Sequence, residues 1–148
     1  MDSREIKKKL RNIKSFIGVY PRDALPNVGK RPVALIANTD SKSEPGEHSI
    51  AIILLKDGRG EYFDSYGLPP LHGDFQRYMS KMCPNKWCYN TSDIQHPVST
   101  SCGLFCIDFI RWRCRGETME EFIMFYTYNT KFNDKIVKCF FVYNVLYL

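Results

Sequence analysis

The chain has 148 residues, 44% hydrophobic and 14% aromatic, a composition typical of a globular domain and not of a disordered segment. No apolar run approaches the roughly 20 residues that a membrane-spanning helix needs, so a membrane protein is not expected. The net charge of +5 is uneven: residues 1–31 carry nine Lys and Arg against three Asp and Glu, and residues 32–148 carry twelve against thirteen.

The six cysteines are expected to be free thiols. The first residues, Met1–Glu5, lack the apolar core of a secretory signal, which favours an intracellular and reducing location. Cys83 and Cys88 do not have the two-residue separation that is usual at zinc sites, and no second pair has ligand-like spacing. No metal is therefore expected.

Residues 3–16 are predicted to form an amphipathic helix, followed by a loop at residues 22–32. The apolar positions recur at three- and four-residue steps: Ile6, Leu10, Ile13 and Ile17. The basic positions lie largely on the other side: Lys7, Lys8, Lys9, Arg11 and Lys14. This basic face is a candidate contact for nucleic acid or another polyanion.

A β-hairpin gives the clearest local signal in the chain. Residues 33–38 and 48–55 are apolar runs that are typical of buried strands. Residues 56–60 follow as a turn that contains Asp-Gly, and residues 61–66 are the return strand. The pattern predicts that the second and third of these strands pair in antiparallel fashion.

The hairpin has a consequence for two polar side chains. With the turn centred near Gly58, the numbers of paired residues sum to about 114 to 116. His48 then lies roughly opposite Tyr66, and Asp64 lies within a residue or two of being its neighbour. We therefore expect His48 and Asp64 to meet at one edge of the sheet.

The second half of the chain is predicted to be mainly helical. Helices are expected at residues 71–82 and 101–115, with a short strand at residues 86–90 between them. Thr118–Glu121 has the pattern of a capping box and starts a further helix.

The end of the chain is predicted to contain a turn at residues 129–133. Asn133 or Asp134 is expected to cap a last helix that runs through Val145. Helices before and after a small antiparallel sheet make one α+β domain over residues 1–148.

Cys102 is the candidate nucleophile. A loop rich in Pro, Ser and Thr runs into Cys102-Gly103, and an apolar run at helical spacing follows. Residues 99–101 offer hydroxyl caps, which places Cys102 at a helix N-terminus. The positive end of the helix dipole favours a thiolate there. Most cysteines are inert buried residues, but this setting favours a reactive thiol.

Acyl transfer by a thiolate also needs a general base, a group that orients the base, and a donor to the oxyanion. His48 and Asp64 are candidates for the first two roles, because the hairpin brings them together. Gln95 precedes Cys102 by seven residues, so its amide is a candidate oxyanion donor beside the Cys102 N–H. The other two histidines lie in loops and are more typical of surface residues.

The order His48, Asp64, Gln95, Cys102 resembles that of the adenovirus-type cysteine proteases, whose fold is shared with the SUMO-specific proteases. The similarity is densest at residues 95–106, Gln-His-Pro-Val-Ser-Thr-Ser-Cys-Gly-Leu-Phe-Cys, and extends to Phe63-Asp64-Ser65-Tyr66-Gly67, residues 16–20 and residues 34–48. Trp87-Cys88-Tyr89-Asn90 and residues 129–134 are similar to proteases of Polinton/Maverick-type transposons and related viruses.

This resemblance implies an adenain- and Ulp1-like fold, with a mainly antiparallel sheet between helices and the nucleophile at the start of a central helix. It implies that Cys102 is the nucleophile, His48 the base, Asp64 its orienting group, and Gln95 with the Cys102 N–H the oxyanion hole. The family cleaves capsid or core precursor proteins during viral maturation, often after Gly-Gly or Gly-Ala.

The resemblance also bears on partners and location. No cofactor is expected to be required, although adenovirus members are activated by DNA and by a short basic peptide. The expected partners are viral or transposon precursor polypeptides, with DNA as a further candidate. A monomer in the host nucleus or at a virus assembly site, or packaged in the virion, is expected. One departure is that the family often has Trp after the catalytic His, where this chain has Ser49.

Two other functions remain open. An isopeptidase that acts on ubiquitin- or SUMO-like modifiers uses the same fold and a similar Gly-Gly preference, although the chain is small and lacks accessory segments. A non-catalytic DNA-binding or scaffold role is suggested by the basic residues 1–31. The presence of all four candidate catalytic residues argues against a purely structural role.

Overall fold

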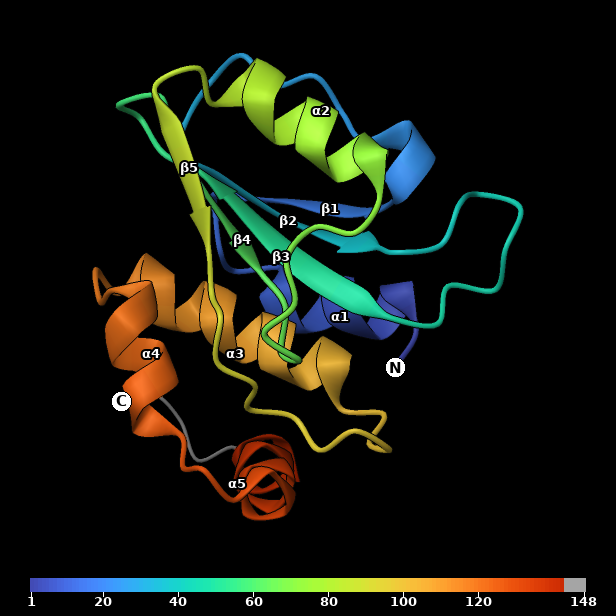
Figure 1. The fold of residues 1–148 in the computed structure, drawn as a ribbon, viewed down its shortest axis with the longest axis vertical. Helices are drawn as coiled ribbons and strands as arrows, with labels where there is room; N and C mark the ends of the chain where they lie inside the picture. The colour runs from blue at the N-terminus through green and yellow to red at the C-terminus, as the bar shows by residue number, and fades with distance from the viewer. Residues whose placement is uncertain (143–148) are drawn as a thin grey trace.

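The computed structural model describes residues 1–142, and Figure 1 shows a five-stranded sheet with helices on both faces. The strands, in sheet order, are β1 (Phe16–Pro21), β2 (Val33–Asn38), β3 (Ser49–Leu54), β4 (Arg59–Phe63) and β5 (Lys86–Tyr89). The helices are α1 (Ser3–Leu10), α2 (Gly73–Met82), α3 (Cys102–Cys114), α4 (Met119–Phe125) and α5 (Thr130–Val142), with a 3-10 turn η1 at Arg22–Ala24. The predicted α+β class is confirmed.

The sheet is mixed, not mainly antiparallel. The central strand β3 is antiparallel to β2 and to β4, as the hairpin signal predicts. The edge strands β1 and β5 are each parallel to their neighbour. Parallel neighbours need long connections, and here these are residues 22–32 and the segment that contains α2.

Both faces of the central strands are buried, so the sheet separates two apolar cores. α2 covers one face and α1 and α3 cover the other, with α4 and α5 packed beyond α3 (Figure 1). Alternate side chains of each strand enter different cores. The α2 core contains Val33, Leu35, Ala37, Ile50, Ile52 and Leu54, and the α3 core contains Ala34, Ile36, Ala51 and Ile53.

The predicted helix at residues 3–16 is too long. α1 ends at Leu10, and residues 16–21 form β1, which pairs with β2. Ile6 and Leu10 are buried, as the helical spacing predicts, but Ile17 is 39% exposed. The helical spacing of apolar residues continues past the helix by coincidence, and pairing with β2 decides the conformation there.

The start of α5 also differs from the prediction. Residues 129–133 are not a turn, because α5 begins at Thr130 and the Asn129 side chain accepts a 3.0 Å hydrogen bond from an N–H of the first turn. Asn133 and Asp134, predicted as caps, lie inside the helix and are buried. Their side chains have partners elsewhere in the fold, which outweighs their preference for a cap.

The other predicted helices match the structure closely. The Thr118 hydroxyl accepts a 3.1 Å hydrogen bond from the N–H of Glu121, which confirms the cap of α4. The predicted extension of the last helix to Val145 lies outside the described residues.

Asp108 is a carboxyl group buried in the core on α3. It is 0% exposed, and its Oδ2 accepts a 2.5 Å hydrogen bond from the Tyr126 hydroxyl. Its Oδ1 has no hydrogen-bond partner among residues 1–142. Burial raises the pKa of Asp108 to about 6, although the bond from Tyr126 opposes the shift. At neutral pH the fold therefore contains a costly buried charge.

The substitution Asp108→Asn should change how stability depends on pH. Between about pH 4 and about pH 6 folded Asp108 holds a proton that the unfolded chain has released, so the free energy of unfolding falls as pH rises. The amide keeps the Tyr126 bond and removes this dependence. As pH rises over this range, the variant should therefore gain up to about 3 kcal/mol of unfolding free energy relative to wild type. Urea denaturation at about pH 4 and about pH 8 measures it, and an unchanged difference would contradict the expectation.

Candidate active site

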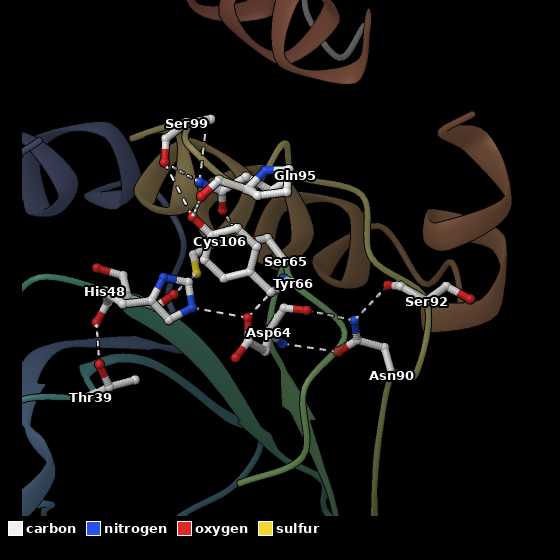
Figure 2. Close-up of polar contacts among 12 residues, drawn as sticks. Thr39, His48, Asp64, Ser65, Tyr66, Asn90, Ser92, Gln95, Ser99 and Cys106 are labelled. Carbon is white, nitrogen blue, oxygen red and sulfur yellow. Dashed lines mark hydrogen bonds and ion pairs between the residues drawn. The ribbon is translucent and has the colours of Figure 1, made fainter. Parts of the chain in front are cut away.

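The ends of β3 and β4 bring His48 and Asp64 together. Ala51 pairs with Phe63, so paired numbers sum to 114 and the predicted register is confirmed. Just beyond the last pair, the His48 ring stacks on the Tyr66 ring with centroids 4.8 Å apart. Nε2 of His48 lies 2.9 Å from Oδ1 of Asp64 (Figure 2). The two residues expected to meet are in direct contact.

Asp64 is held on both sides by hydrogen bonds. Its N–H donates to Oδ1 of Asn90 at 2.9 Å, and Nδ2 of Asn90 donates to the Asp64 carbonyl at 2.7 Å. The Tyr66 N–H donates to Asp64 Oδ1 at 2.8 Å, the oxygen that also faces His48. Figure 2 shows Asn90 on the side of Asp64 away from His48. The bonds with Asn90 hold the Asp64 backbone, and the bond from Tyr66 holds its carboxylate beside the imidazole.

Asn90 has a structural role that the sequence analysis missed. It follows β5 directly and is buried. A polar residue just after a strand often serves only as a turn residue, and the parallel pairing of β4 with β5 has no local signal. That pairing brings the ends of the two strands side by side, and so places Asn90 against Asp64.

Cys102 is the first residue of α3, as predicted. Burial by itself raises the pKa of its thiol, but hydrogen bonds with the His48 ring and with the backbone of Ser49 and Gly103 outweigh this, so the pKa lies below its ordinary value. Because Nε2 of His48 faces Asp64, Nδ1 is the ring nitrogen left to contact the thiol.

The pKa of His48 is shifted in the opposite direction. Burial lowers it, but the hydrogen bonds with Asp64 and Cys102 raise it to about 9. A lowered thiol pKa and a raised imidazole pKa in one contact favour a thiolate–imidazolium pair at neutral pH. This pair can supply both a nucleophile and a proton donor.

The hydroxyls before Cys102 do not cap α3 as predicted. Ser101 is at the cap position, but its side chain makes no capping bond, and its buried hydroxyl has no partner among residues 1–142. The Ser99 hydroxyl instead accepts a 3.0 Å hydrogen bond from the N–H of Ser101. The serines therefore shape the loop, and the N–H groups at the start of α3 are left without a serine cap.

Gln95 lies fully buried beside this loop. Its Nε2 donates to the Ser99 carbonyl at 2.9 Å and lies 3.3 Å from the Ser99 hydroxyl (Figure 2). Its Oε1 accepts a hydrogen bond from the Ser65 hydroxyl. The structure thus shows Gln95 as a brace of the loop that leads to Cys102, and its role as an oxyanion donor stays a prediction.

The basic residues proposed for nucleic-acid contact lie on and just after α1. Four of them are exposed: Lys7, Lys8, Arg11 and Lys14. Lys9 is half-buried, with its ammonium group 5.1 Å from the centroid of the Phe141 ring. A face of four exposed cations is compatible with a polyanion contact, whereas Lys9 packs against α5.

The described part of the chain offers neither a cluster of side chains for a metal ion nor a helix that could span a membrane. Among residues 1–142, no three His, Cys, Asp or Glu side chains are placed to hold a metal ion. No helix in this range is both long and apolar enough to cross a membrane. All six cysteines have free thiols.

Solved structures that share this fold include the following two. The ASFV pS273R protease matches with a TM-score of 0.53 and 24% identity, over 70% of this chain and 44% of that chain. The central domain of the uncharacterized Lpg1148 protein from Legionella pneumophila matches with a TM-score of 0.54 and 17% identity, over 94% of this chain and 92% of that one. No family model and no curated protein matches. The chain thus has the fold of part of a viral protease and spans under half of its length.

The substitution His48→Ala should slow alkylation of Cys102. Without the imidazolium, burial dominates and the pKa of the thiol rises. With iodoacetamide near neutral pH, we expect the variant to react on the order of 10- to 100-fold more slowly, with its pH profile moved to higher pH. Mass spectrometry of the labelled peptides distinguishes Cys102 from the other thiols. The matched control is His72→Ala, an exposed histidine, and identical profiles for wild type and His48→Ala would refute the pairing.

Proposed function

We propose that this protein is a cysteine endopeptidase. The observation that carries the proposal is the contact of Cys102 with His48, in which the thiol pKa is lowered and the imidazole pKa is raised. Asp64 lies on the far nitrogen of the ring, at 2.9 Å. A nucleophile, a base and an orienting carboxylate in this order are the requirements of thiol-dependent acyl transfer. The fold shared with the ASFV pS273R protease supports the same reading.

The reaction follows from this geometry. The Cys102 thiolate attacks the carbonyl carbon of the scissile bond, and the negative charge moves to the carbonyl oxygen near the start of α3. The His48 imidazolium then gives its proton to the leaving amine, which departs and leaves a thioester. Neutral His48 next takes a proton from water, which attacks the thioester and releases the acid. Asp64 holds the ring in one orientation through its 2.9 Å contact with Nε2.

The proposed substrates are precursor proteins of a virus or a virus-like element, cleaved after small residues. The resemblance of residues 95–106 to adenovirus-type proteases supports this choice. The residue after His48 departs from the usual family pattern, because it is Ser49 in place of Trp; Ser49 is buried, with its hydroxyl 3.5 Å from Oδ1 of Asn38. The aromatic ring packed on His48 is that of Tyr66.

Peptide cleavage tests the proposal directly. Wild-type protein should cleave members of a panel of Gly-Gly-X and Gly-Ala-X peptides, or the capsid precursors of the parent element. Cys102→Ala should reduce the rate by on the order of 10³-fold or more, because it removes the nucleophile. Absence of cleavage by wild type, or equal cleavage by the variant, would refute an endopeptidase. Labelling by a ubiquitin- or SUMO-vinyl-sulfone probe would instead favour the isopeptidase function.

We also propose that the exposed cations on and just after α1 bind DNA alongside this activity. Binding to a short DNA duplex should weaken with salt, with a log–log slope of about −3 to −4 if Lys7, Lys8, Arg11 and Lys14 each contact a phosphate. The double variant Lys7→Glu, Lys8→Glu should reduce the slope by about two. The matched control is Lys138→Glu on α5, and a slope near zero for wild type would remove the proposal.

A further inference from the structure

The loop between Gln95 and Cys102 is tied to α5 through one residue, Ser99. The Ser99 hydroxyl donates to Oδ1 of Asp134 at 3.1 Å and accepts the Ser101 N–H at 3.0 Å. The Ser99 carbonyl accepts from Nε2 of Gln95 at 2.9 Å and from the Tyr66 hydroxyl at 3.3 Å. Figure 2 shows Ser99, Gln95 and Tyr66 converging at this point. Ser99 thus contacts α5, the predicted oxyanion donor and the residue before the nucleophile.

The same turn of α5 also holds the chain just before the loop, at Ile94. Asn133 is fully buried, and its Nδ2 donates to the Ile94 carbonyl at 3.1 Å and to the Thr127 carbonyl at 2.7 Å. Its Oδ1 accepts the Thr127 N–H at 2.9 Å. Asn133 and Asp134 therefore hydrogen-bond to the chain on both sides of Gln95, at Ile94 and at Ser99. Buried polar groups of this kind are costly to leave unpaired, so the loop has one strongly preferred position.

This position matters for the oxyanion that acyl transfer creates. The Cys102 N–H follows directly after the Ser101 N–H that Ser99 anchors, and the Gln95 amide is held by the Ser99 carbonyl. An amide nitrogen carries two hydrogens. The 2.9 Å bond to the carbonyl uses one, and the other makes only the longer 3.3 Å contact with the hydroxyl, so it is the hydrogen that can exchange that contact for a bond to an oxyanion. Because Asp134 accepts the hydroxyl hydrogen, Ser99 stays in place when this happens.

We propose that Ser99 and Asp134 are positioning residues that set the oxyanion site through Gln95 and the N–H of Cys102. Neither touches the reacting atoms. The inference rests on the proposed function, because an oxyanion site serves only a reaction in which charge develops on a carbonyl oxygen.

Two reactions of Cys102 distinguish this role from general support of the fold. With iodoacetamide, the sulfur–carbon bond forms as iodide leaves with the bonding electrons, and no oxygen gains charge. With the peptide aldehyde acetyl-glycyl-glycinal, the sulfur–carbon bond forms and the carbonyl electrons move to oxygen. The oxygen then takes the proton of the His48 imidazolium, which gives a neutral hemithioacetal. Only in the second reaction does an oxygen occupy the oxyanion site and accept hydrogen bonds from its donors, first as an anion and then as a hydroxyl.

The substitutions Asp134→Ala and Ser99→Ala should therefore weaken aldehyde binding by about 10-fold or more, since loss of a well-placed donor costs on the order of 10²- to 10³-fold. The rate of alkylation should stay within about 2-fold of wild type, because the thiolate and His48 are untouched. Asp134→Asn should recover most of the affinity, because its amide oxygen still accepts from Ser99. The matched control is Asp93→Ala, an exposed carboxylate in the same connection, which should change neither reaction.

Two outcomes would overturn the inference. Aldehyde affinity of Asp134→Ala and Ser99→Ala equal to that of wild type would show that the loop needs no such support. A parallel loss of alkylation and aldehyde binding, together with a lower melting temperature, would assign both residues a structural role. Failure of wild type to bind the aldehyde at all would refute the proposed function as well, so the two failures are distinguishable.

Discussion

The pairing of β3 with β4 is the constraint on which the rest of this structure depends. Side chains alternate between the two faces, so Ile52 enters the core under α2 while Ile53 enters the core under α3. A slip of one residue would reverse both assignments and also separate His48 from Asp64. The packing that stabilises the sheet and the hydrogen bond between His48 and Asp64 are therefore selected by the same register. Stability and chemistry are not independent in this fold.

The part of the site that sequence could predict is the part determined by short stretches of chain. The Asp57-Gly58 turn fixes the hairpin, and from it the contact of His48 with Asp64 follows by counting. Cys102 could be placed at the start of α3 because an apolar helical run begins directly after it. In each case the decisive signal lies within about 16 residues of the side chain that it positions.

The part that could not be predicted depends on contacts between distant segments. β1 is an edge strand whose conformation comes from parallel pairing with β2, and its own residues continue a helical pattern. Asn133 has the residue type of a helix cap, yet its amide is buried against the Ile94 carbonyl. Asn90 resembles an ordinary turn residue until β5 is placed beside β4. Residue type limits what such side chains can do, but only the fold selects their partners.

The contact of α5 with the loop between Gln95 and Cys102 has a consequence for when, during synthesis, the proposed protease becomes active. A nascent chain that has been translated through α4 already carries His48, Asp64, Gln95 and Cys102, but it lacks the helix that holds Ser99. Domains fold largely as units while they are made, and late segments dock last. For the proposed protease, this order of synthesis would keep an unfinished polypeptide on the ribosome from cleaving its surroundings until α5 has docked against Ser99.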